Sequence, residues 1–101
     1  MSDDGPLPVV VWPLGPAISR ADIPVLCDQL AVVVRYGGVR LILCDVSAVS
    51  DHDVVLVEAL LRLQLTARRL GGRIRVHRAS PQLLDLLTAT GLRTVITGEP
   101  P

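Results

Sequence analysis

The sequence predicts a single α/β domain with a mixed, mostly parallel sheet of about four strands and three main helices. β-branched runs typical of strands alternate along the chain with segments whose apolar residues recur at helical spacing. Such alternation is typical of parallel strands joined by right-handed crossovers. Half of the 101 residues are hydrophobic and Phe is absent, so the core must be aliphatic. A chain of this length makes one domain, expected over residues 8–97, between a flexible tail at 1–7 and a tail at 98–101.

The first half of the chain predicts a strand, a helix and a second strand. The β-branched run at residues 9–12 ends at Pro13, which has no amide hydrogen for a strand ladder. Helical spacing begins after Asp22, a residue type that caps helix N-termini, and the glycine pair at 37–38 ends it. Residues 39–46 are almost continuously apolar, which is typical of a central parallel strand.

The longest helix is predicted over residues 54–70. Asp53 can cap its N-terminus, and the glycine pair at 71–72 ends it. Glu58 and Arg62 stand four residues apart in the favourable order, so we expect them to form an ion pair on the exposed side of this helix.

The last third of the chain predicts a strand, a helix and a final strand. Residues 73–77 alternate between polar and apolar, as a half-exposed or edge strand does. Ser80 followed by Pro81 is the preferred order at a helix start, and Gly91 ends the leucine-rich segment that follows. The β-branched residues at 94–97 predict a last short strand.

Composition and motifs exclude several classes of function. Ten basic and ten acidic residues leave no basic surplus for binding nucleic acid. No apolar run reaches the length of a membrane span and no secretory signal is recognisable, so we expect a cytoplasmic protein without direct membrane insertion. The sequence has no glycine-rich nucleotide fingerprint, nucleophile–base pair or ligand-spaced His/Cys set, so we expect no enzyme, cofactor or metal. Cys27 and Cys44 are predicted to be small buried hydrophobic residues.

Titratable residues are concentrated between the second predicted strand and the long helix. Open α/β sheets place ligands at this end of their strands. Asp51, His52 and Asp53 are consecutive there, either as loop and capping residues or as a catalytic or metal-binding group. Asp45 ends the strand and either accepts from loop amides or, with Ser47, forms a small-ligand site.

The first turn of the long helix contains an apolar candidate for a binding site. Val54 and Val55 stand there together. They are either core residues or a partly exposed apolar pair suited to contact with another protein.

Four segments of the chain have a joint spacing that matches one known family. They are Leu41-Ile42-Leu43-Cys44-Asp45-Val46-Ser47, Ala59-Leu60-Leu61-Arg62-Leu63, Ala67-Arg68-Arg69-Leu70-Gly71-Gly72-Arg73 and Leu86-Leu87-Thr88-Ala89-Thr90-Gly91-Leu92. Through these segments the chain resembles the STAS domain, which anti-sigma factor antagonists share with the cytoplasmic tails of sulfate transporters. The resemblance covers about two-thirds of the chain and implies a STAS-like fold in a minimal version that lacks the usual C-terminal helix.

The resemblance implies a non-enzymatic, protein-binding module of the anti-sigma factor antagonist type. In an ungapped alignment the family's motif aspartate falls on Asp53 and its phosphorylated serine on Val54. Valine cannot accept phosphate, so no switch by serine phosphorylation is expected at this position. The residues expected to face a partner are Asp51, His52, Asp53, Val54, Val55, Glu58 and Arg62.

The same resemblance leaves the partner open. An anti-sigma factor serine kinase is one candidate. One alternative is a STAS-type accessory subunit of a transport ATPase complex, as in lipid-asymmetry transport. Another is a sensor of a small ligand or nucleotide that uses the Asp45 to Asp53 end of the sheet. The family's first strand is not evident either, so we expect an uncovered sheet edge or face, closed by a partner or by a second copy in a homodimer.

Overall fold

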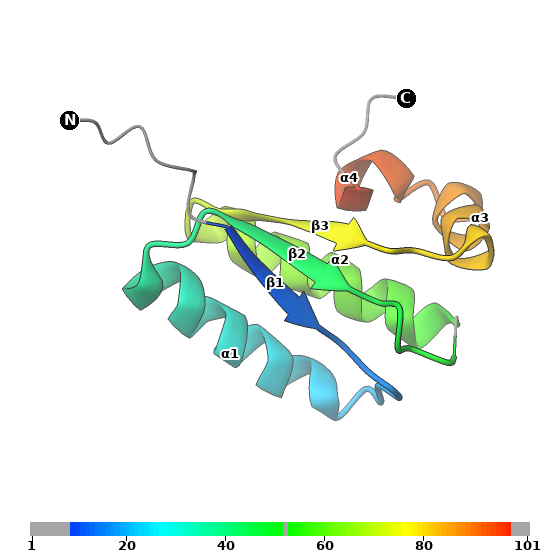
Figure 1. Ribbon diagram of the computed structural model, residues 1–101, viewed down its shortest axis with the longest axis horizontal. Coiled ribbons are helices and arrows are strands. Elements are labelled where there is room, and N and C mark those ends of the chain that lie inside the picture. The colour runs from blue at the N-terminus through cyan, green and yellow to red at the C-terminus, as the bar shows by residue number, and fades with distance from the viewer. Residues whose placement is uncertain (1–8, 52, 98–101) are drawn as a thin grey trace.

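The computed structural model describes residues 9–51 and 53–97, in which three parallel strands and four helices alternate (Figure 1). The expected tails at 1–7 and 98–101 lie outside the described residues. The α/β class and the three main helices are confirmed. The strands are β1 (Val9–Pro13), β2 (Leu41–Asp45) and β3 (Arg73–His77), and the helices are α1 (Asp22–Gly37), α2 (Val54–Arg69), α3 (Pro81–Ala89) and α4 (Arg93–Thr97).

The sheet is parallel throughout, and its order is β1-β2-β3, so β2 is the central strand, as predicted. In-register pairing sets Val11, Leu43 and Arg75 side by side across it. Each crossover moves by one strand in the same direction. Right-handed connections therefore bring α1 and α2 to the same face of the sheet, where the two helices pack against each other (Figure 1).

The two faces of the sheet differ in burial. Ile42, Cys44 and Ile74 point toward the helices and are buried. On the opposite face Val9 and Val11 are exposed, and the neighbouring β2 side chains are only half-buried. Within the described residues no helix covers this second face, and no strand lies beyond β1.

The helix termini follow the sequence signals with one correction. The Ser80 hydroxyl caps α3 by accepting from the Leu83 amide, and Gly38 ends α1 in the left-handed region at φ 67°. Asp22 is the first residue of α1, not its N-cap. A turn at residues 19–22 precedes the helix, and the Asp22 carboxylate reaches back to accept from the amide and the hydroxyl of Ser19.

Residues 94–97 belong to α4, so the prediction of a fourth strand there was wrong. The buried side chain of Gln64 on α2 explains this outcome. Its Nε2 donates to the carbonyls of Ile74 (3.2 Å) and Val95 (2.6 Å), and its Oε1 accepts from the Ile74 amide (2.9 Å). At the outer edge of β3 the amide and the carbonyl of Ile74 are thus already hydrogen-bonded, and burial of Ile96 holds α4 against the core. Tertiary packing overrides the strand propensity of this segment. The short helix α4 therefore stands where the last strand was predicted.

The first prediction tests the role of Gln64. Gln64→Leu should lower the free energy of unfolding by about 1–3 kcal/mol, because leucine leaves the buried Ile74 amide without its acceptor. Chemical denaturation measures the difference. Gln82→Leu, at an exposed position of α3, is the control and should change stability by less than about 0.5 kcal/mol. Equal midpoints for wild type and Gln64→Leu would show that this side chain does not stabilise the β3 edge.

Candidate partner-binding site

The loops that follow β1 and β2 are joined at the carboxyl end of the sheet. The Ser50 amide donates to the Pro16 carbonyl at 3.1 Å, and the Ser50 hydroxyl lies 3.3 Å from the same oxygen. Gly15 adopts φ 107° and packs on Val49, so that a Cβ atom at Gly15 would lie 3.0 Å from Val49 Cγ2. Only glycine combines this conformation with so close an approach. These contacts make the two loops one continuous surface.

Asp45 fixes the start of the second loop. Its Oδ1 accepts from the Ser47 amide at 2.9 Å, and its Oδ2 lies 3.6 Å from Arg78 Nη1. Hydrogen bonds from the Ser47 amide and then from its hydroxyl lower the pKa of Asp45, and the nearby guanidinium of Arg78 adds to this effect. The candidate ligand residues Asp45 and Ser47 therefore bind each other in this structure, and their use by a ligand stays a prediction.

The first turn of α2 presents one valine to solvent. Asp53 caps the helix as predicted, with Oδ1 accepting from the Leu56 amide at 3.1 Å. Val54 follows with 62% of its surface exposed, while Val55 is half-buried. Of the two alternatives for this pair, the structure shows Val54 on the surface.

Glu58 pairs with a residue other than the one predicted. Its Oε1 lies 3.0 Å from Nε of Arg20, in the loop before α1, and the described residues contain no Glu58–Arg62 ion pair. Glu58 pairs with Arg20 because the fold brings the β1–α1 loop next to the first turns of α2. Sequence spacing shows only partners on the same helix. Arg62 remains exposed one turn further along.

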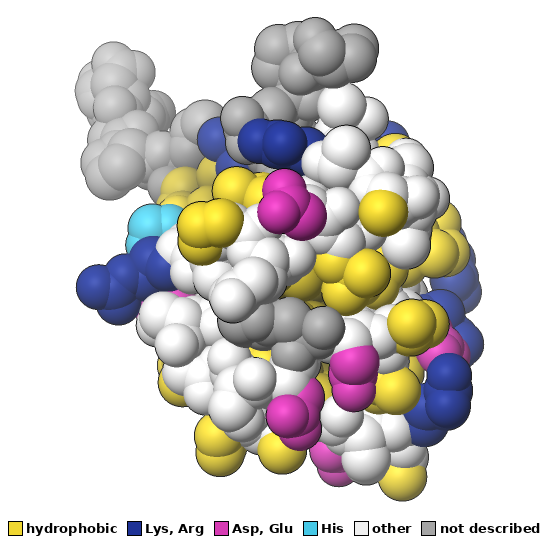
Figure 2. Space-filling view, turned by 90° about the vertical axis from the view of Figure 1, so that its right-hand side faces the viewer, with side chains coloured by type: hydrophobic (Ala, Val, Ile, Leu, Met, Phe, Trp, Pro, Cys, Tyr) yellow, Lys and Arg dark blue, Asp and Glu magenta, His cyan; other side chains and the backbone are white. Residues whose placement is uncertain are grey.

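Most of the residues expected to face a partner gather at this end of the molecule. Asp51, Asp53 and Val54 are exposed there, and Glu58 is half-buried beside them. His52 lies outside the described residues. Figure 2 views this end and shows acidic side chains spread among apolar ones, with arginines at the margin. We call Asp51, Asp53, Val54 and Glu58 the helix-start surface.

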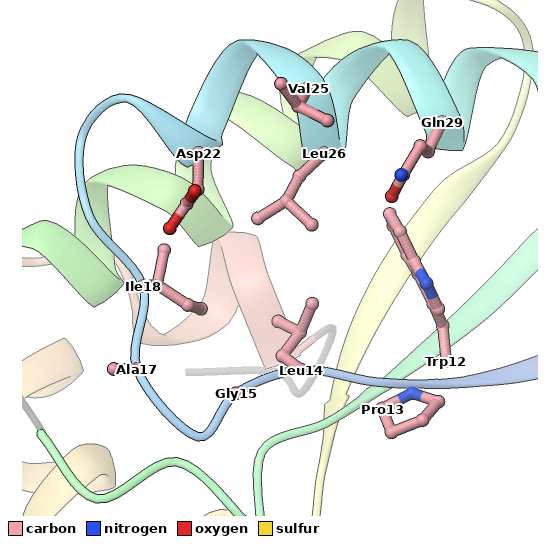
Figure 3. Close-up of a pocket in the computed structure, with 10 residues that line it drawn as sticks. All are labelled: Trp12, Pro13, Leu14, Gly15, Ala17, Ile18, Asp22, Val25, Leu26 and Gln29. Atoms are coloured by element: carbon pink, nitrogen blue, oxygen red, sulfur yellow. The ribbon is translucent and has the colours of Figure 1, made fainter.

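A cavity of about 310 Å³ lies between β1, the loop after it, and α1 (Figure 3). The Trp12 indole rises from β1 toward Gln29 of α1, with Leu26 and Ile18 nearby. Sequence analysis missed this cavity because its walls come from two elements that only the fold brings together. Neither of the candidate ligand residues on β2 and its loop is among its lining residues.

Two observations on the described residues concern metal binding and thiol chemistry. Within it, no group of three or more His, Cys, Asp or Glu side chains is placed to hold a metal. Burial raises the pKa of the Cys44 thiol to about 12, which keeps it protonated and unreactive. No helix of residues 9–51 and 53–97 is long and apolar enough to cross a membrane.

The fold and this surface define a small α/β module with a helix N-terminus exposed beside joined loops. Over residues 11–97 the chain matches the family model described as "Mlab, STAS domain". The chain belongs to the STAS domain family, and STAS domains are regulatory or binding modules that are generally not catalytic. No curated protein matches the chain significantly.

The second prediction concerns the α2 cap. Asp53→Ala should lower the free energy of unfolding by about 0.5–2 kcal/mol, because the Leu56 amide loses its acceptor. Chemical denaturation measures the change, with the exposed Asp51→Ala as control. A midpoint that does not differ from that of the control would contradict the capping role.

The third prediction uses the low pKa of Asp45. A carboxylate whose pKa is lowered by folding adds stability above its unfolded pKa, near 3.8, and this stability is lost as the pH falls through the folded value. Asp45→Asn keeps an acceptor for Ser47 but removes the charge. The variant should be less stable than wild type at neutral pH, and the difference should shrink as the pH is lowered below about 4. Denaturation at a series of pH values tests this, and a constant difference would contradict it.

Proposed function

We propose that this chain is a non-enzymatic regulatory module that binds a protein partner through the helix-start surface. The observation that carries the proposal is the 62% exposure of Val54 at the first turn of α2. An apolar side chain there loses contact with water when a partner covers it. The two loops beside it are held together by hydrogen bonds, so little conformational entropy is lost on binding.

The charges around Val54 indicate what kind of partner surface would fit this site. Asp51 and Asp53 flank it with exposed carboxylates, and Glu58 is already neutralised by Arg20. Interfaces commonly combine a buried apolar centre with a polar rim of complementary charge. A suitable partner presents an apolar recess for the valine and basic groups opposite the two aspartates.

We favour an anti-sigma factor serine kinase as this partner, which makes the chain antagonist-like. We take Val54 as the counterpart of the serine that is phosphorylated in antagonists, as the resemblance in sequence implies. With no hydroxyl to accept phosphate, the complex is not released by modification at this position. Binding is then controlled by the concentrations of the two proteins. We place both partners in the cytoplasm.

An accessory subunit of a transport ATPase is the second candidate. The absence of a phosphate acceptor at Val54 also suits a permanent assembly, which needs no release step, and the matching family description names no anti-sigma factor. Small-ligand sensing is the third candidate, supported by the cavity beside Trp12.

The fourth prediction tests the helix-start surface. Val54→Asp should leave the fold intact, because the side chain is exposed and a carboxylate at a helix N-terminus interacts favourably with the helix dipole. The same charge, buried and unpaired in the complex, should weaken binding by about 2–5 kcal/mol. Thermal melting and affinity for the protein captured from native lysate measure the two effects.

Leu65→Asp is the matched control, since Leu65 is 48% exposed further along the same helix. It should bind the partner as wild type does. A stable Val54→Asp protein with unchanged affinity would exclude the proposed contact. Capture of a serine kinase supports the first candidate, and capture of an ATPase supports the second.

A further inference from the structure

Exposed apolar side chains gather on the first strand and the first helix. Among the described residues, five of the eight large hydrophobic side chains that are exposed belong to β1 and α1, and the other three are Val54, Leu65 and Val95. Two of them lie on the uncovered side of the sheet and three on α1, so together they flank the outer edge of β1 from both sides; we call these five the β1–α1 face. They are Val9, Val11, Val25, Val32 and Tyr36, with exposures of 43%, 54%, 55%, 56% and 77%.

The helical members of this face form one stripe on the β1 side of α1. Spacings of seven and four residues place side chains on the same side of a helix, and these are the spacings between Val25, Val32 and Tyr36. Gln29 stands between them, and both Gln29 and Val25 line the cavity that Trp12 of β1 enters (Figure 3). The stripe therefore lies beside the edge strand.

The outer edge of β1 is free to pair within the described structure. The Leu14 amide donates to the backbone carbonyl of Asp45 in β2, so the even-numbered residues of β1 direct their backbone N–H and C=O groups toward β2. Backbone direction alternates along a strand, so Val9 and Val11 direct theirs outward. Proteins commonly protect such edges with charged side chains or proline; β1 has no charged side chain, and its one proline, Pro13, is its last residue. The opposite edge of the sheet is occupied by Gln64 and α4.

We propose that the β1–α1 face is the interface of a homodimer. In it, β1 pairs antiparallel with β1 of a second copy, and α1 packs antiparallel against α1 of that copy. This proposal does not rest on the proposed function, because it uses a different surface.

A second copy fits this face for reasons of symmetry and charge. A two-fold interface must be self-complementary, and an uncharged strand meets its own copy without repulsion. Arg35, in the last turn of α1, lines the recess between α1 and α2 and so lies away from the stripe. Antiparallel packing of two copies of α1 places opposite ends of the helix dipoles next to each other. The middle of the stripe contains the neutral Gln29.

The fifth prediction tests the dimer with the full chain. Sedimentation over a wide concentration range should show a monomer–dimer equilibrium for wild type. Val11→Lys should raise the dimer dissociation constant about tenfold or more, because a charged side chain would lie at the centre of the paired strands. Val32→Lys should also weaken the dimer through the helices. Val54→Lys is the control, an exposed valine outside the face, and should dimerise as wild type does.

Amide hydrogen exchange gives a second readout that does not depend on a variant. The Val11 amide should be protected in concentrated wild-type protein and should lose that protection on dilution. A wild-type chain that is monomeric at every concentration would overturn the proposal. So would a dimer that both Val11→Lys and Val32→Lys leave unchanged. Partner binding by Val11→Lys should match wild type, which separates failure of the dimer from failure of the proposed function.

Discussion

Two right-handed crossovers that move in the same direction across a parallel sheet must place their helices on the same face. This constraint gives α1 and α2 a shared core, in which the inward side chains of β2 are buried. It also leaves the opposite face without a helical layer. Because the strands are parallel, both loops that lead into these helices emerge at one end of the sheet. The helix-start surface exists at that end for this reason.

Local signals in the sequence were sufficient for most of the framework. Two helix starts could be predicted from Asp53 and Ser80, because their side chains accept hydrogen bonds from amides only three residues further along the chain. The glycine pairs identified the ends of α1 and α2 for a similarly local reason. Residues 94–97 were mispredicted because their β-branched side chains favour a strand, while the partner that decides their structure, Gln64, lies about thirty residues earlier.

The sequence was sufficient to propose where a candidate site lies, but not how its residues are arranged. The alternation of strand and helix placed candidate residues at the carboxyl end of the sheet. Whether Val54 or Val55 faces solvent depends on a rotation of α2 that no single sequence specifies. The Arg20–Glu58 pair joins residues 38 positions apart, so helical spacing could not reveal it. The cavity beside Trp12 likewise requires two elements whose packing is set by the whole fold.

The hydrogen bonds of Gln64 have a consequence for how far this sheet can grow. A sheet with two unpaired edges can recruit copies on both sides and extend into a fibre. Here a side-chain amide fills the backbone positions of Ile74 that a fourth strand would need, and α4 lies over the same edge. Growth by strand addition is then possible on one side only, so an assembly made in that way closes after two chains.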